Sequence, residues 1–88
     1  MEAFVLIQTQ SGSGPVGAAL RAIPGIESTN DLTGPFDAIA LASAESMGDL
    51  LQTVVSRIRE LPGVTRALPA PLVRSSSPSI RDGAKQAA

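Results

Sequence analysis

Hydrophobic residues in this chain follow two different spacings. Residues 3–7 and 38–42 are apolar at consecutive positions, which predicts short strands that are buried on both faces. Residues 16–23 and 47–61 instead carry apolar side chains three and four positions apart, which predicts amphipathic helices. The pattern therefore predicts a fold in which strands and helices share one core.

A short phrase occurs twice and marks the end of each predicted helix. Residues 20–26 read LRAIPGI and residues 58–64 read IRELPGV. Proline disfavours a helical conformation at the residue before it, and the following Gly25 or Gly63 can adopt left-handed backbone angles that reverse the chain. A β-branched residue then opens a strand, so the chain is expected to contain two helix-to-strand units in series.

The remaining segments complete a regular order of elements. Residues 26–33 are polar enough for an edge strand, and a turn at Gly34-Pro35 joins them to a strand at 36–42. The last strand begins at residue 64, and Pro69 and Pro71 confine it to an edge because they cannot donate ladder hydrogen bonds. The order βαββαβ predicts an α+β, ferredoxin-like fold with a four-stranded antiparallel sheet, both helices on one face, and the first and third strands in the centre.

This arrangement leaves one face of the sheet without a covering layer. Two helices cover a single face, whereas the two central strands are predicted to be apolar on both faces. A second copy of the chain, packed sheet to sheet, would bury the open face and give a homodimer. The alternative is that small apolar side chains on this face are tolerated in water.

Composition limits the chain to one domain. With 88 residues and a hydrophobic fraction of 43%, the core is small, and association would stabilise it. We assign residues 1–74 to the folded domain. Residues 75–88 begin with a serine-rich stretch and lack apolar periodicity, so a disordered C-terminal tail is expected there.

Charge and residue types exclude several classes of function. Seven basic and eight acidic residues leave a net charge of −1 without a basic block, so direct nucleic-acid binding is not expected. The chain has no cysteine or histidine, and we therefore expect no disulfide, no metal site and no cofactor. General acid-base chemistry would fall on Asp31, Asp37 or a scattered glutamate without a catalytic pair, which argues against an enzyme. The apolar runs are too short to span a membrane, and a cytoplasmic location is expected.

Two motifs resemble a known family. The hairpin Thr33-Gly34-Pro35-Phe36-Asp37, and the segment 54–66 that reads VVSRIRELPGVTR, are similar to the effector-binding (RAM) domain of the Lrp/AsnC transcription regulators. The resemblance covers residues 3 to about 73. Members generally carry an N-terminal helix-turn-helix, whereas this chain begins at the first strand, so it resembles a stand-alone effector domain.

The resemblance implies a dimer through the sheets, an octamer of four dimers in some members, and a small effector, commonly an amino acid, bound near the hairpin. The ligand-binding residues that it implies are Thr33, Gly34, Phe36, Asp37, Thr65 and Ala67. In this hairpin, Asp37 would pair with an α-ammonium group. Without the resemblance, Asp37 is better interpreted as a turn cap. Ala67 and Pro69 stand where many members place threonines, which leaves the identity of an effector open.

Three functions follow as hypotheses. The first is a ligand-sensing and oligomerisation module that binds an amino acid and modulates transcription through DNA-binding family members. The second is a purely structural assembly domain. The third is an ACT-type domain that regulates an enzyme, which has the same order of elements but pairs its sheets edge to edge. A charge at Val5 or Ile7 separates face packing from edge pairing, provided that these side chains point away from the helices.

Overall fold

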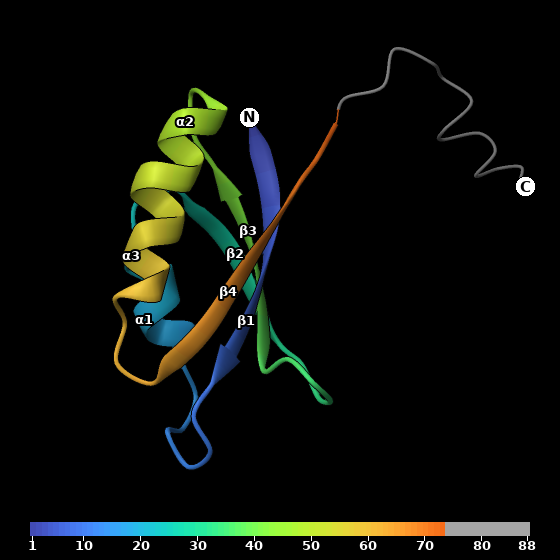
Figure 1. The fold of residues 1–88 in the computed structure, drawn as a ribbon, viewed down its shortest axis with the longest axis vertical. Helices are drawn as coiled ribbons and strands as arrows, with labels where there is room; N and C mark the ends of the chain where they lie inside the picture. The colour runs from blue at the N-terminus through green and yellow to red at the C-terminus, as the bar shows by residue number, and fades with distance from the viewer. Residues whose placement is uncertain (74–88) are drawn as a thin grey trace, which may run out of the picture.

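Strands and helical segments follow one another along the chain in the order predicted from the sequence. The computed structural model describes residues 1–73 (Figure 1), and the predicted tail and its boundary lie outside them. The four strands are β1 (Glu2–Thr9), β2 (Ile26–Asp31), β3 (Ala38–Ser43) and β4 (Val64–Pro71). The first helix is α1 (Gly17–Arg21), and the second consists of α2 (Met47–Asp49), η1 (Leu50–Val55) and α3 (Ser56–Arg59) in continuous succession.

The four strands form one antiparallel sheet with the order β2-β3-β1-β4. The first and third strands are therefore central and the other two lie at the edges, as predicted. Val5 of β1 lies opposite Ala40 on β3 and opposite Pro69 on β4. A proline is compatible with this position because β4 is an edge strand. Both helices lie on the same side of the sheet (Figure 1), which confirms the ferredoxin-like fold.

The two faces of the sheet have different side chains. The face toward the helices is built from small residues and β-branched residues that are fully or almost fully buried: Ala3, Val5, Ile7, Ala38, Ala40, Ala42 and Ala67. The opposite face, called the open face below, carries apolar residues on the alternating positions, five of them larger and one an alanine: Phe4, Leu6, Ile39, Leu41, Leu68 and Ala70. Of these, Phe4 is 39% exposed. The open face is therefore apolar and has no covering layer within residues 1–73.

This alternation settles which residues can test sheet-to-sheet packing. A charge at Val5 or Ile7 is informative only if these side chains point away from the helices. Both instead lie in the core under the helices, where the small side chains of β3 let the helices approach the sheet. A charge at either position would disrupt the core, so Phe4 and Leu6 are the appropriate positions.

The first helix is shorter than the sequence pattern predicts. Proline suits the first turn of a helix, so Pro15 is expected there, but the helix begins at Gly17, with Val16 as an N-cap that makes no side-chain hydrogen bond. Without a capping side chain, backbone N–H groups of the first turn stay unpaired, and no such bond stabilises an earlier start of the helix. Val16, Leu20 and Ile23 are nevertheless buried as predicted.

The second helix begins as predicted and then changes its pitch. Ser46 followed by Asp49 resembles a capping box, which predicts a helix start at Ser46, and the Ser46 hydroxyl does accept a hydrogen bond from the Asp49 backbone N–H at 3.1 Å. The next six residues form a π-helical turn, in which the repeat is wider than in an α-helix. The helical spacing of Met47, Leu50, Leu51 and Val54 predicts that Leu51 is buried, but Leu51 is 39% exposed and Val55 is buried instead.

The Pro-Gly phrases end the helices as predicted, and the first one packs tightly. Gly25 has φ of 101°, a left-handed value that side chains oppose. A Cβ atom at Gly25 would lie 2.9 Å from Val54 Cγ2 and 3.0 Å from the Ser43 carbonyl oxygen. The turn therefore brings the start of β2 against both the second helix and the end of β3.

Neighbouring leucines in the π-helical turn provide a test of its register. Leu50→Ala should lower the free energy of unfolding by about 2–5 kcal/mol, because Leu50 is fully buried. Leu51→Ala should cost less than about 1 kcal/mol. Urea denaturation followed by circular dichroism measures both. Equal losses for the two variants would contradict the π-helical register.

Two glycines with left-handed angles separate backbone strain from crowding. Gly34 has φ of 108°, but a Cβ atom added there would have no neighbouring atom within 4 Å, so Gly34→Ala should cost only the strain, about 1–2 kcal/mol. Gly25→Ala adds the contact with Val54 and should cost more. The same denaturation measurement compares them. A larger loss of stability for Gly34→Ala than for Gly25→Ala would contradict the close packing of Gly25 against Val54.

Candidate functional site

The hairpin between β2 and β3 is fixed to the end of the central strand β1. The hairpin is closed by a hydrogen bond from the Leu32 backbone N–H to the Asp37 carbonyl oxygen at 2.9 Å. Two further bonds reach β1: the Asp37 backbone N–H donates to the Ile7 carbonyl oxygen at 2.8 Å, and Gln8 Nε2 donates to the Pro35 carbonyl oxygen at 2.8 Å. The hairpin is thus held in place by both the backbone and a side chain of β1.

Asp37 is the residue that makes the hairpin chemically distinctive. Its Oδ2 atom accepts a hydrogen bond from the Thr9 backbone N–H at 2.8 Å, where the β1–β3 ladder ends. The residue is exposed, so its carboxylate also faces solvent. A carboxylate has several acceptor positions, and one bond to a backbone N–H leaves others for a cationic ligand. The turn-cap interpretation and the binding interpretation are therefore compatible.

The other hairpin residues predicted to bind a ligand lie at the surface. Thr33 and Gly34 are exposed, and Phe36 is half-buried. The positive φ of Gly34 lets the tip reverse direction. The structure therefore brings Thr33, Gly34, Phe36 and Asp37 together on one projecting loop.

The two predicted residues from β4 have different positions. The Thr65 hydroxyl donates to the Gln8 carbonyl oxygen at 3.2 Å, so Thr65 lies across β1 from the hairpin. Ala67 is 2% exposed and its side chain is in the core. Its carbonyl oxygen accepts a hydrogen bond from Arg59 Nη2 at 3.0 Å. Within a single chain, Ala67 offers a ligand no side-chain surface.

A pocket of about 440 Å³ lies beside the hairpin and includes only Asp37 of the predicted residues. Its walls come from the end of β1, the loop that follows it and the end of β2: Thr9, Gln10, Ser11, Gly12, Gly14, Pro15, Val16, Asp31 and Asp37. Two carboxylates and no basic side chain line it, so its electrostatic character favours a cationic group.

Sequence reasoning missed the contribution of the loop between β1 and α1. The signal was present, since Ser11-Gly12-Ser13-Gly14 is a polar, glycine-rich connection between a strand and a helix. Its proximity to Asp31 and Asp37 was not predictable, because it depends on where the hairpin folds back. Gln10 fixes the loop by donating its backbone N–H to the Gly63 carbonyl oxygen at 2.7 Å.

Other kinds of site find little support in the described part of the chain. Within residues 1–73, no group of three or more acidic side chains is arranged to hold a metal ion. Neither helical segment in that range has the length and hydrophobicity of a membrane span. The hairpin with its adjoining pocket and the open face of the sheet are candidate functional features.

Comparison with known proteins supports the family resemblance seen in the sequence motifs. The model of the Lrp/AsnC ligand binding domain family matches residues 2–68. No curated protein gives a significant match. Among solved structures, TTHA0845 from Thermus thermophilus is 28% identical with a TM-score of 0.75, and the alignment covers 86% of this chain and 96% of that one.

Two further solved structures share the architecture. FFRP-DM1 is 25% identical with a TM-score of 0.73, and the alignment covers 82% of this chain and 97% of that one. The hypothetical protein PHS023 from Pyrococcus horikoshii is 24% identical with a TM-score of 0.72; the alignment covers 85% of this chain and 92% of that one, and it shows the fold alone. Because the family model spans most of the chain, this protein belongs to the Lrp/AsnC ligand binding domain family.

Proposed function

We propose that this chain is a dimeric sensor of a small effector, an amino acid, that modulates transcription by assembling with DNA-binding Lrp/AsnC regulators. Membership of a ligand-binding regulatory family supports the general role. The observation that carries the specific proposal is the solvent-facing Asp37 carboxylate at the edge of a pocket with a second carboxylate, Asp31. An α-ammonium group is the part of an amino acid that such a site would bind most strongly.

The apolar open face, which a second copy of the chain could cover, supports the dimeric part of this proposal. Phe4, Leu6 and Leu68 are among the larger apolar side chains on that face, and burying them against a second sheet would stabilise a small domain. The loops at the strand ends, including the hairpin, would then lie at the rim of the dimer. Binding of an effector there would alter how dimers assemble with partners.

A purely structural assembly role is the second candidate, and two contacts favour it. The Thr65 hydroxyl and the Asp37 carboxylate both make hydrogen bonds within the fold, and Ala67 is in the core. In this role the hairpin would only brace the end of β1. An ACT-type enzyme regulator is less consistent with the fold, because the large apolar surface lies on a sheet face, not along an edge.

Asp37→Asn tests effector binding without removing the oxygen that accepts the Thr9 N–H bond. If Asp37 pairs with an ammonium group, the wild-type melting temperature should rise with one or a few amino acids, and Asp37→Asn should bind them about 10- to 100-fold more weakly. Glu60→Gln, an exposed position after the second helix, is the control and should respond normally. Thermal-shift titration measures all three proteins. An unchanged response in Asp37→Asn would contradict the proposed role, and no response to any amino acid would favour the assembly role.

Phe4→Asp tests the proposed dimer interface. A buried, unpaired carboxylate at this position should convert the dimer to a monomer, because desolvation of the charge adds to the loss of the apolar contacts. Thr53→Asp, exposed on the second helix, should leave the mass unchanged. Light scattering coupled to gel filtration gives the mass, and circular dichroism checks the fold. A folded Phe4→Asp variant with the wild-type dimer mass would rule out the open face as the interface.

A further inference from the structure

We propose that the effector is a basic amino acid whose carboxylate is bound by Arg21, whose α-ammonium group is bound by Asp31 and whose side-chain cation is bound by Asp37. The inference rests on the effector site proposed above and extends it from the hairpin to a second pocket between α1 and β2. It names the chemical class of the ligand, and it places the side-chain cation, and not the α-ammonium group, at Asp37.

A pocket of about 400 Å³, called the helix pocket below, lies between α1 and β2. It adjoins the pocket beside the hairpin, called the hairpin pocket below, because Pro15 and Asp31 line both of them. Each volume is in the range of small-molecule sites. A ligand at Asp31 would therefore have room to extend in two directions, toward α1 and toward the hairpin.

Arg21 is the basic side chain of this site. Among residues 1–73, it is the only basic residue that lines either pocket. Its Nη1 atom donates to the Thr29 hydroxyl at 3.0 Å, which holds the guanidinium over β2. A guanidinium has five N–H groups, so this bond leaves others for a ligand. Arginine binds a carboxylate with two parallel hydrogen bonds, and Arg21 is therefore suited to the carboxylate of an amino acid.

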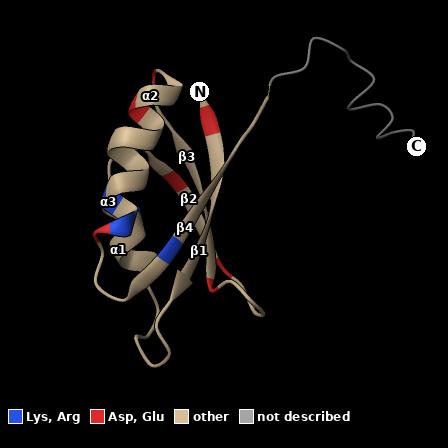
Figure 2. Cartoon of the chain, in the orientation of Figure 1, with Lys and Arg blue, Asp and Glu red and all other residues tan. Residues whose placement is uncertain are grey.

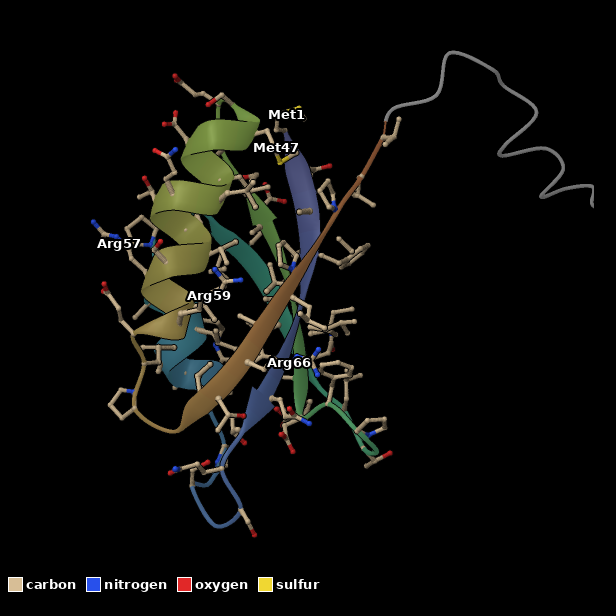
Figure 3. All side chains as sticks on the ribbon, in the orientation of Figure 1. Met1, Met47, Arg57, Arg59 and Arg66 are labelled. Carbon is tan, nitrogen blue, oxygen red and sulfur yellow. The ribbon has the colours of Figure 1, made fainter. Side chains whose placement is uncertain are left out.

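The other arginines of the described chain lie away from the two pockets. Figure 3 shows Arg57 on the side of the second helix away from the sheet, and Arg66 beside the sheet. Arg59 donates to the Ala67 carbonyl oxygen on β4, which is the sheet edge opposite β2. None of these three residues lines either pocket.

Asp31 lies one strand repeat from the residue that Arg21 contacts. Thr29 is paired with Ala40 on β3, and Ala40 is buried under the helices. Asp31 is paired with Ala38, which is buried in the same way. Paired residues share a face of the sheet, so Thr29 and Asp31 both point to the helix side, with Cα atoms about 7 Å apart.

The charges of Arg21 and Asp31 are close but not paired with each other. Within residues 1–73, the side-chain bond of Arg21 is the one to Thr29, and the Asp31 carboxylate makes none. An amino acid fits between them because its carboxylate and its α-ammonium group are bonded to the same carbon. Ion pairs of about 2.8 Å would join the carboxylate to Arg21 and the ammonium group to Asp31.

Asp37 adds a second carboxylate on the far side of Asp31. Figure 2 shows the acidic colour where β2 and β3 approach the hairpin. Asp31 and Asp37 are the charged residues of the hairpin pocket, and a neutral amino acid bound at Asp31 would leave Asp37 without a cationic partner. A side chain that ends in an ammonium or guanidinium group supplies this partner. The three charges of the site therefore match a ligand with one anionic and two cationic groups.

Gly17, the first residue of α1, leaves the room that the Arg21 guanidinium occupies. A Cβ atom at this position would lie 3.2 Å from Arg21 Nη1 and 3.7 Å from the Thr29 hydroxyl oxygen. The first distance is shorter than an ordinary van der Waals contact, so an alanine would displace the guanidinium from Thr29. Alanine is nevertheless the better helix former. Glycine at this position therefore favours the arginine–threonine contact over the stability of the helix.

Ligand analogues that each lack one charge provide a direct test, measured as dissociation constants by isothermal titration calorimetry at low salt. Lysine should bind the wild-type chain about ten-fold or more tightly than norleucine, which lacks only the side-chain ammonium group. Lysinamide, which lacks the carboxylate charge, and 6-aminohexanoic acid, which lacks the α-ammonium group, should bind more weakly than lysine by a similar factor.

Matched variants assign each charge of the ligand to one side chain. Arg21→Gln should bind lysine about ten-fold or more weakly than the wild-type chain, but should bind lysinamide equally well, because the group that Arg21 contacts is already absent. Asp37→Asn should bind lysine no more tightly than norleucine, and Asp31→Asn should bind lysine no more tightly than 6-aminohexanoic acid.

Gly17→Ala separates the ligand site from the stability of the fold. This variant should bind lysine several-fold more weakly, whereas its melting temperature without ligand should be unchanged or higher than that of the wild-type chain. Arg57→Gln, an exposed arginine on the second helix, is the matched control and should bind lysine normally. Circular dichroism confirms that every variant is folded.

Several results would overturn the inference. If lysine, ornithine and arginine all bind no more tightly than norleucine, the effector is not a basic amino acid, although the effector site proposed above stands when Asp37→Asn weakens binding of another amino acid. If Arg21→Gln binds lysine like the wild-type chain, Arg21 does not hold the carboxylate. If no amino acid binds the wild-type chain, the proposed sensor function fails and this inference fails with it.

Discussion

The central strand β1 is apolar on both faces, but the helices cover only one of them. On the covered side, Val5 and Ile7 form the middle of the core together with the alanines of β3. On the other side, Phe4 and Leu6 have no layer above them within the described residues. The same strand that organises the fold therefore creates a surface that a partner would cover. Because a domain this small has a small core, covering this surface by association would add to its stability.

The candidate ligand site depends on the same strand. Gln8 and Thr9, at its end, hold the hairpin through a side-chain amide and a backbone N–H, and Asp37 is the residue that receives the latter bond. The pocket beside Asp37 begins where β1 leaves the sheet. A change in how two open faces pack would therefore reach the hairpin through one short stretch of backbone. This proximity would give an effector at the hairpin a physical route to influence the proposed assembly.

Much of the fold could be predicted from the sequence because its signals were strong and local. The two Pro-Gly phrases and the prolines of β4 act through backbone geometry, the Ser46 cap acts through a side-chain hydrogen bond, and each has the predicted effect. The direction of the β1 side chains could not be predicted, since a strand that is apolar at every position gives no alternation to interpret. The exchange of Leu51 for Val55 in the core depends on a π-helical turn, which changes the repeat without a distinctive sequence. The pocket walls around Asp31 required the tertiary fold.

Isotope-filtered nuclear Overhauser spectroscopy on a mixture of labelled and unlabelled chains tests the central claim most directly, because it detects only contacts between copies. We predict intermolecular signals from the side chains of Phe4, Leu6 and Leu68, which are exposed or half-buried in the single chain. Signals confined to the backbone edges of β2 or β4, or their absence in a sample shown to be dimeric, would contradict face-to-face packing.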